Sequence, residues 1–161
     1  MLQRIQTLYL LAVVILGITL LFQPIVTFVT PEDADVLRIW KLTPMGLKEI
    51  TSSELPPLQL QGLWGLLLAT IIIPILALVN IFLYNRRILQ ARLNIFLALL
   101  CLGFYGVVAI YVWLMKLCVE NVSWVPESWA AVPLVCFVLT LMATRRILKD
   151  EALVRAADRL R

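Results

Sequence analysis

The sequence predicts an all-α membrane protein: a four-pass transmembrane helix bundle with both termini in the cytoplasm and a small β-sheet cap on the outside. Three observations predict this fold. Hydrophobic residues make up 62% of the 161 residues, against roughly 45–50% in soluble domains. They fall in four runs near membrane length. Ten of the 14 Lys and Arg residues lie in segments 1–4, 85–92 and 145–161, which the positive-inside rule places in the cytoplasm.

The first span is expected over residues 5–28, an apolar run that follows Arg4 and becomes less regular at Gln23 and Pro24. A secretory signal is the alternative interpretation. The run is longer than the roughly 7–15 apolar residues of a signal core, and no small-x-small cleavage motif follows it. The sequence therefore favours a signal anchor.

The second and third spans are expected over residues 63–84 and 93–116. Each is long enough to cross about 30 Å of hydrocarbon at roughly 1.5 Å per residue. Pro74 lies inside the second span and predicts a kink, which membrane helices tolerate. The cytoplasmic link between the two spans is residues 85–92.

The fourth span, residues 129–146, is the shortest. Aromatic belt residues on its outer side, Trp124 and Trp129, and the long side chains of Arg145 and Arg146 extend its reach across the bilayer. The tail that follows, residues 147–161, continues as a charged amphipathic helix.

Two outer loops, residues 30–58 and 117–128, are expected to form the cap. Residues 25–30 and 36–43 are rich in β-branched side chains and predict a hairpin, with a turn at 31–35. Because two strands alone are marginally stable in water, residues 119–124 are expected to add a third. An irregular loop without a sheet is the alternative.

Ionisable groups are scarce where membrane chemistry would need them. The sequence contains no His, and no Asp, Glu, Arg or Lys lies deep in any expected span. Pumps and proton carriers keep such groups despite their cost. Cys101, Cys118 and Cys136 show no metal or disulfide spacing and are expected to pack as apolar side chains. No catalytic residue, metal site or cofactor is therefore expected.

A membrane enzyme remains the weakest alternative. Its carboxylates would come from the outer loops, where acidic side chains are usually solvated. Those carboxylates are Glu32, Asp33, Asp35, Glu49, Glu54, Glu120 and Glu127.

Polar side chains inside the spans are expected to make hydrogen bonds between helices rather than to contact a substrate. They are Thr19, Gln23, Thr70, Asn80 and Thr140. The G-x-x-G spacings at 62–65 and 103–106 predict a close approach of helices, within the bundle or with a partner.

The cytoplasmic link and tail hold the candidate contact residues: Asn85, Arg86, Arg87, Gln90, Arg92, Arg145, Arg146, Arg155 and Arg159. Two interpretations remain open for the link. It binds phospholipid head groups, or its arginine side chains dock on carboxylates of a partner protein. The tail would lie on an anionic leaflet or bind a cytoplasmic protein. Nucleic acid is not expected, because positive loops beside spans are what membrane insertion selects.

Three segments together resemble a known family. They are residues 1–10, the 85–90 turn and the tail 149–161, whose sequence is KDEALVRAADRLR. The chain is similar to the four-helix membrane proteins of domain of unknown function 4293, found in Bacteroidota. The resemblance implies a bacterial inner membrane, with the cap in the periplasm, and implies no activity. The order of spans and strands is also similar to claudin-like proteins, but the first outer loop lacks their cysteine pair.

The function expected from this pattern is a non-catalytic inner-membrane accessory or scaffold subunit, bound to a membrane or cytoplasmic partner through the link and the tail. The alternative is a protein that binds a lipid or a small amphiphile. That alternative predicts an elongated apolar pocket between the kinked second span and its neighbours.

Overall fold

The computed structural model describes residues 3–32, 36–50, 64–83, 86–119 and 122–159. Four α-helices dominate the fold, and a short 3-10 helix, η1, precedes the last of them. Their bounds are α1 (Gln3–Leu20), α2 (Trp64–Phe82), α3 (Arg87–Cys118), η1 (Ser128–Ala131) and α4 (Val132–Arg159).

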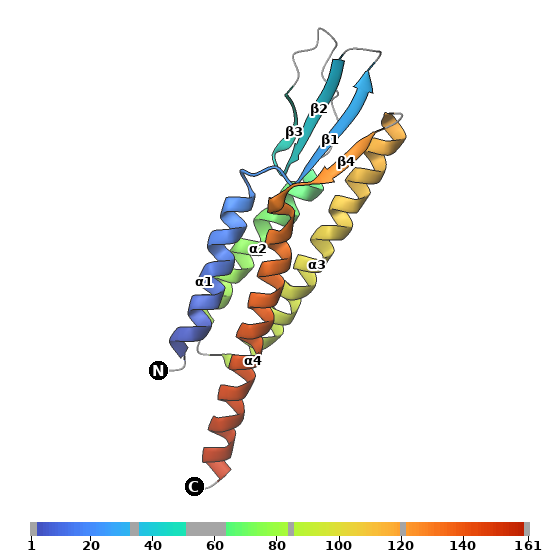
Figure 1. The fold of residues 1–161 in the computed structure, drawn as a ribbon. Coiled ribbons are helices and arrows are strands. Elements are labelled where there is room, and N and C mark those ends of the chain that lie inside the picture. The colour runs from blue at the N-terminus through green and yellow to red at the C-terminus, as the bar shows by residue number, and fades with distance from the viewer. Residues whose placement is uncertain (1–2, 33–35, 51–63, 84–85, 120–121, 160–161) are drawn as a thin grey trace.

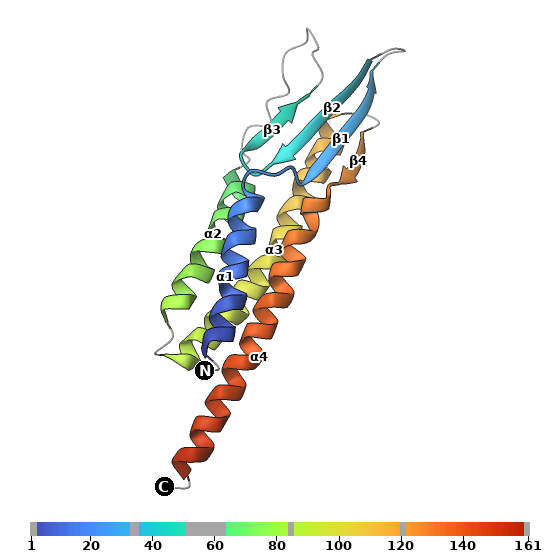
Figure 2. The same cartoon turned by 60° about the vertical axis from the view of Figure 1, so that its left-hand side comes forward.

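The four α-helices run side by side, and the sheet lies at one end of the bundle (Figures 1 and 2). Each helix packs against two others, in the order α1, α2, α3, α4 and back to α1. The other end of the bundle carries both chain termini. There α4 extends past the other three helices, so its last part projects from the bundle (Figure 1).

The outward faces of the helices carry many large apolar side chains. In water a monomer rarely exposes apolar surface on this scale. Helices that are hydrophobic all round are typical of buried or membrane segments. Windows at Trp64–Phe82, Ile88–Cys118 and Ser128–Asp150 are long and apolar enough to cross a membrane, and Gln6–Leu20 is a shorter apolar helix. The exposed side chains include Leu11, Ile15, Leu68, Ile75, Leu99, Ile110, Val135 and Val138.

The expected span 5–28 is wrong at its C-terminal end, because α1 ends at Leu20. The last turn tightens there, with the N–H groups of residues 21–23 donating to the carbonyls three residues earlier. Pro24 follows and disfavours helix at the residue before it. The β-branched residues from Val26 onwards then enter a strand.

The other helix bounds differ from the expected spans by a few residues at most ends. The main difference is that α3 begins at Arg87, so most of the expected link 85–92 is helical. At the far end of the chain, α4 is continuous through the expected tail to Arg159. The expected link of eight residues is therefore shortened, because its residues 87–92 belong to α3.

A glycine and a proline bring α1 and α2 together. A Cβ placed on Gly17 would lie 3.1 Å from the Cβ and Cδ atoms of Pro74, closer than most real contacts. The absence of a side chain at Gly17 therefore lets α2 approach at its proline. By contrast, Gly103 and Gly106 face open space within the part of the chain that the structure describes. The expectation that this G-x-x-G pair brings two helices of the bundle together is wrong.

The cap is a four-stranded antiparallel sheet with the order β3-β2-β1-β4. The strands are β1 (Val26–Glu32), β2 (Val36–Thr43), β3 (Gly46–Glu49) and β4 (Ser123–Pro126). The hairpin of β1 and β2 is confirmed, with Val26 opposite Leu42 and Phe28 opposite Trp40. The residues between β1 and β2, 33–35, lie outside the described part, so the turn expected over 31–35 is not described, and β1 itself extends to Glu32.

A third expected strand is present but shifted, and a fourth was not expected. The strand predicted at 119–124 lies at Ser123–Pro126 and pairs with β1, because α3 continues to Cys118. The unexpected strand, β3, pairs with β2 through a two-residue turn at Pro44 and Met45. A proline in that position is a turn signal, since its fixed φ suits the first corner.

One face of the sheet is joined to the helical core. Phe28, Trp40 and Leu42 are at most 2% exposed, and they belong to the same buried cluster as Leu20 and Met115. The alternation of side chains along β1 and β2 directs these residues to one face. The cap is thus packed onto the helix ends, which fixes its position over α3.

Candidate functional site

A mostly apolar groove lies where the sheet meets α3. Its volume is about 360 Å³, within the range of small-molecule sites. The start of β1, β4 and η1 form its other walls. The lining residues are Ile25, Val26, Tyr105, Val108, Ala109, Val112, Trp113, Lys116, Trp124, Pro126 and Ala130.

The helical period of α3 explains its share of this lining. Tyr105, Ala109, Val112 and Lys116 are spaced three or four residues apart, so they lie on one face of the helix. From Tyr105 to Lys116 this face is about 16 Å long at roughly 1.5 Å per residue. The groove is therefore elongated along α3. This groove is not the pocket expected beside the second span, since no α2 residue is among its lining residues.

Tyr105 ties α3 to the start of α4. Its hydroxyl donates to the carbonyl oxygen of Ala130 at 2.8 Å and accepts from the backbone N–H of Leu134 at 3.1 Å. Ala130 and Leu134 are four residues apart, so these are the groups that a regular α-helix would join directly. The tyrosine hydroxyl is inserted into this step at the junction of η1 and α4. Such an insertion is a recognised cause of helix bending.

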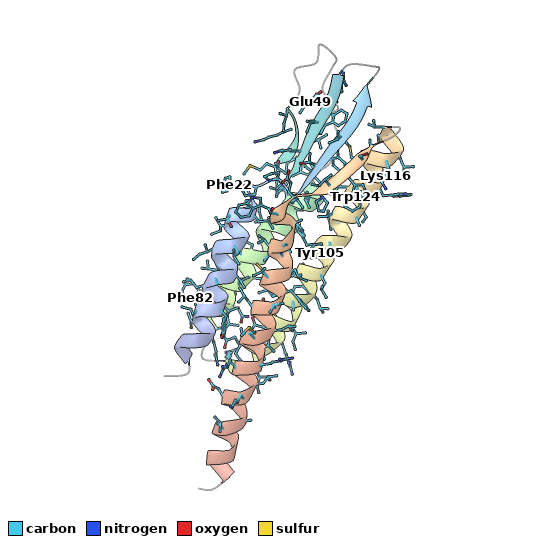
Figure 3. The ribbon with its side chains drawn as sticks, in the orientation of Figure 1. Phe22, Glu49, Phe82, Tyr105, Lys116 and Trp124 are labelled. Atoms are coloured by element: carbon cyan, nitrogen blue, oxygen red, sulfur yellow. The ribbon has the colours of Figure 1, made fainter. Side chains whose placement is uncertain are left out.

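Lys116 provides the charge at the other end of the groove. Its Nζ lies 6.0 Å from the centre of the Trp124 ring, within the range of a cation–π contact. Figure 3 shows Lys116 beside Trp124 at the sheet end of α3, with Tyr105 farther along the helix. Lys116 is the single charged residue among the lining residues that the structure describes. The charge of the groove thus lies at its Lys116 end, and the ring of Tyr105 lies at the other end.

A second polar cluster lies at the opposite end of the bundle, between α2 and α3. The side-chain amide of Asn80 donates to Oδ1 of Asn94, and Nε2 of Gln90 donates to the backbone carbonyl of Asn80 at 3.1 Å. Asn80 and Asn94 are 0% exposed and Gln90 is 5% exposed. Two atoms, Asn80 Oδ1 and Asn94 Nδ2, are buried without a hydrogen-bond partner among the described residues.

The other polar residues of the spans behave differently from the expectation. The hydroxyls of Thr70 and Thr140 donate to carbonyls four residues earlier in their own helices. The hydroxyl of Thr19 donates to the carbonyl of Leu16, three residues earlier in α1. These bonds lie within helices and not between them. Asn80 alone of the expected set makes a described bond between helices, whereas Gln23 lies beyond the end of α1.

The described contact residues expected in the link and tail differ in their surroundings. Arg86, Arg92, Arg145 and Arg146 are exposed, whereas Gln90 is used inside the bundle. Asn85 lies outside the described residues, and so do the side chains of Arg87, Arg155 and Arg159. The base of the tail is fastened to α1, because Nε2 of Gln6 donates to Asp150 Oδ2 at 2.8 Å.

The described carboxylates of the cap are engaged in ion pairs. Glu49 lies 4.0 Å from Arg38, and Glu127 lies 3.8 Å from Lys41 while accepting a hydrogen bond from Thr27 at 2.6 Å. Glu49 belongs to β3, and Glu127 follows β4, at opposite edges of the sheet. These two carboxylates therefore do not form a shared cleft. Asp33, Asp35, Glu54 and Glu120 lie outside the described residues, and so does the side chain of Glu32.

The three cysteines do not form disulfides in the structure. Cys101 and Cys136 are buried and Cys118 is exposed, all as free thiols. No group of three or more His, Cys, Asp or Glu side chains forms a metal site within the described ranges.

Comparison with known proteins gives a family without an activity. The family model described as "Domain of unknown function (DUF4293)" matches residues 2–160. No curated protein matches the chain.

Proposed function

Because the chain belongs to the DUF4293 family, whose description assigns no activity, we propose from the geometry that it is a non-catalytic membrane protein that holds a lipid or similar amphiphile. The amphiphile lies in the groove between α3, the sheet and η1. The protein crosses the bacterial inner membrane four times, with the cap in the periplasm and both termini in the cytoplasm.

The position of the groove is the observation that carries this proposal. It lies where α3 meets the sheet, and the sheet lies at one end of the bundle (Figure 1), the level at which lipid head groups are expected in a four-pass topology. Its walls are apolar and aromatic, and Trp113 is 63% exposed beside it. Acyl chains suit such walls, because contact between apolar side chains and water is unfavourable.

The charge distribution and the fold support the proposed orientation. The end of the bundle away from the sheet carries exposed Arg86, Arg92, Arg145, Arg146 and Lys149. Basic residues that flank membrane spans are retained on the cytoplasmic side. The sheet and the groove then face the periplasm.

Filling the groove tests the proposal. Ala109 lines it, so Ala109→Trp should place a bulky ring in the space of one chain and reduce the lipid retained after detergent purification by about tenfold, the factor for roughly 1.4 kcal/mol. The measurement is native mass spectrometry of lipid adducts.

The neighbouring residue supplies the matched control. Ile110 lies on the same helix, is 56% exposed and does not line the groove. Ile110→Trp should keep wild-type lipid retention. Equal retention in both variants at equal unfolding temperature would refute the groove as the binding site.

The protruding end of α4 favours a second function, an accessory or scaffold subunit of a membrane complex. The helix continues to Arg159 past the bundle, and Leu148 and Leu153 on it are 53% and 55% exposed. An exposed helix with apolar residues suits docking on a cytoplasmic protein. The arginines of the link, Arg86 and Arg87, would add contacts to carboxylates.

Truncation separates the tail from the bundle. Residues 1–150 keep the bond between Gln6 and Asp150 and remove the rest of the tail. A stoichiometric partner should co-purify with the full chain in mild detergent and be lost with the truncated one, at unchanged unfolding temperature. Absence of any stoichiometric partner on the full chain would contradict the accessory function.

A further inference from the structure

We infer that the occupant of the groove is a lipid with an anionic head group, held at Lys116, with one acyl chain running along α3 toward Tyr105. This inference rests on the proposed function and names its ligand class.

Lys116 supplies the positive charge that would pair with the anionic head group. Lys116 is exposed, and no carboxylate of the described residues forms an ion pair with it. Glu127, which follows β4, is already engaged by Lys41 and Thr27. An ammonium group at the edge of an apolar groove loses part of its hydration and gains from a fixed anion. Lysine is a common binder of phosphate in proteins.

The ring of Trp124 holds this ammonium in position. The contact at 6.0 Å places Nζ over the ring face and limits the reach of the side chain. Trp113, which is exposed on α3 as Lys116 is, adds a second aromatic ring at the interface. Tryptophan prefers the head-group level of a bilayer. The head of the ligand is thus expected at this level and not deeper.

Tyr105 makes the inner end of the groove unsuited to a second polar group. Its hydroxyl is engaged on both sides, by the carbonyl of Ala130 and the N–H of Leu134. It therefore presents mainly its ring to the groove. A ligand with one anionic head and an apolar end matches this polarity, whereas a ligand with polar groups at both ends does not.

The charge of Lys116 is tested by lipid competition on the full chain. The probe is an equal mixture of phosphatidylglycerol and phosphatidylcholine with identical chains, and the readout is adduct abundance in native mass spectrometry. Wild type should retain phosphatidylglycerol about tenfold over phosphatidylcholine, as expected for one charge-assisted contact. Lys116→Gln should abolish the preference, and Lys116→Arg should keep it.

A lysine on the sheet gives the control. Lys48 in β3 is exposed and does not line the groove, so Lys48→Gln should retain the preference. Equal retention of both lipids by wild type would overturn the proposal that the head group is anionic. The proposed function would still stand if Ala109→Trp lowered the retention of both lipids. Displacement of phosphatidylglycerol by inorganic phosphate alone would overturn the role of the acyl chain.

Discussion

Replacing Asn94 with leucine should lower the free energy of unfolding by about 2 kcal/mol, because it leaves a buried amide without its partner. Asn80 and Asn94 lie fully buried between α2 and α3, and the amide of Asn80 donates to Oδ1 of Asn94. Leucine is close in size to asparagine but offers no acceptor. Nδ2 of Asn80 would then join Oδ1 of the same side chain as an unpaired atom.

The double variant distinguishes the cost of losing the hydrogen bond from the cost of leaving one buried amide without a partner. Removing one partner of a buried pair costs its full desolvation, whereas removing both with apolar groups is far less costly. Asn80→Leu together with Asn94→Leu should therefore be less destabilising than the sum of the two single changes, with a coupling of about 1–2 kcal/mol. Gln90 keeps its bond in every variant, since it binds the backbone carbonyl of Asn80.

Unfolding in mild detergent by titration with sodium dodecyl sulfate gives the required free energies. The control is Thr140→Val, which removes a buried hydroxyl whose bond stays within α4. It should cost less than Asn94→Leu, because no second helix loses a contact. Additive effects of the two asparagine changes would show that the amides do not stabilise one another.

Helix positions were the most predictable part of the fold. The apolar runs at 63–84 and 93–116 correspond to α2 at Trp64–Phe82 and α3 at Arg87–Cys118. Hydrophobic length defines a membrane segment almost independently of its neighbours. The error at α1 arose because apolar character alone does not distinguish the end of a helix from a β-branched strand such as β1.

The groove could not be predicted from local pattern. Ile25 and Lys116 line the same space although they are far apart in the sequence, and the sheet brings them together. The helical spacing of Tyr105, Ala109 and Lys116 can be seen in the sequence. A shared face of a helix does not, however, indicate which other element packs against that face. The turn at Pro44, by contrast, was a local signal that predicts β3.

Tyr105→Phe should lower the free energy of unfolding by about 1–3 kcal/mol, since it leaves a backbone donor and a backbone acceptor without the hydroxyl between them. The groups affected are the N–H of Leu134 and the carbonyl of Ala130, at the junction of η1 and α4. The phenyl ring keeps its size, so the groove keeps its wall. Loss of stability would therefore report on the inserted hydroxyl and not on packing.

Hydrogen exchange locates this effect. Amides at residues 128–134 should exchange faster in Tyr105→Phe, whereas amides near Gln6 and Asp150, at the far end of the bundle, should be unchanged. Tyr9→Phe is the control, because Tyr9 is half-buried in α1 and its hydroxyl bonds to no described residue. If the helix step closes directly once the hydroxyl is gone, exchange at 128–134 and the unfolding free energy will both match wild type. The hydroxyl would then be a passive neighbour of α4 rather than the link between the groove and that helix.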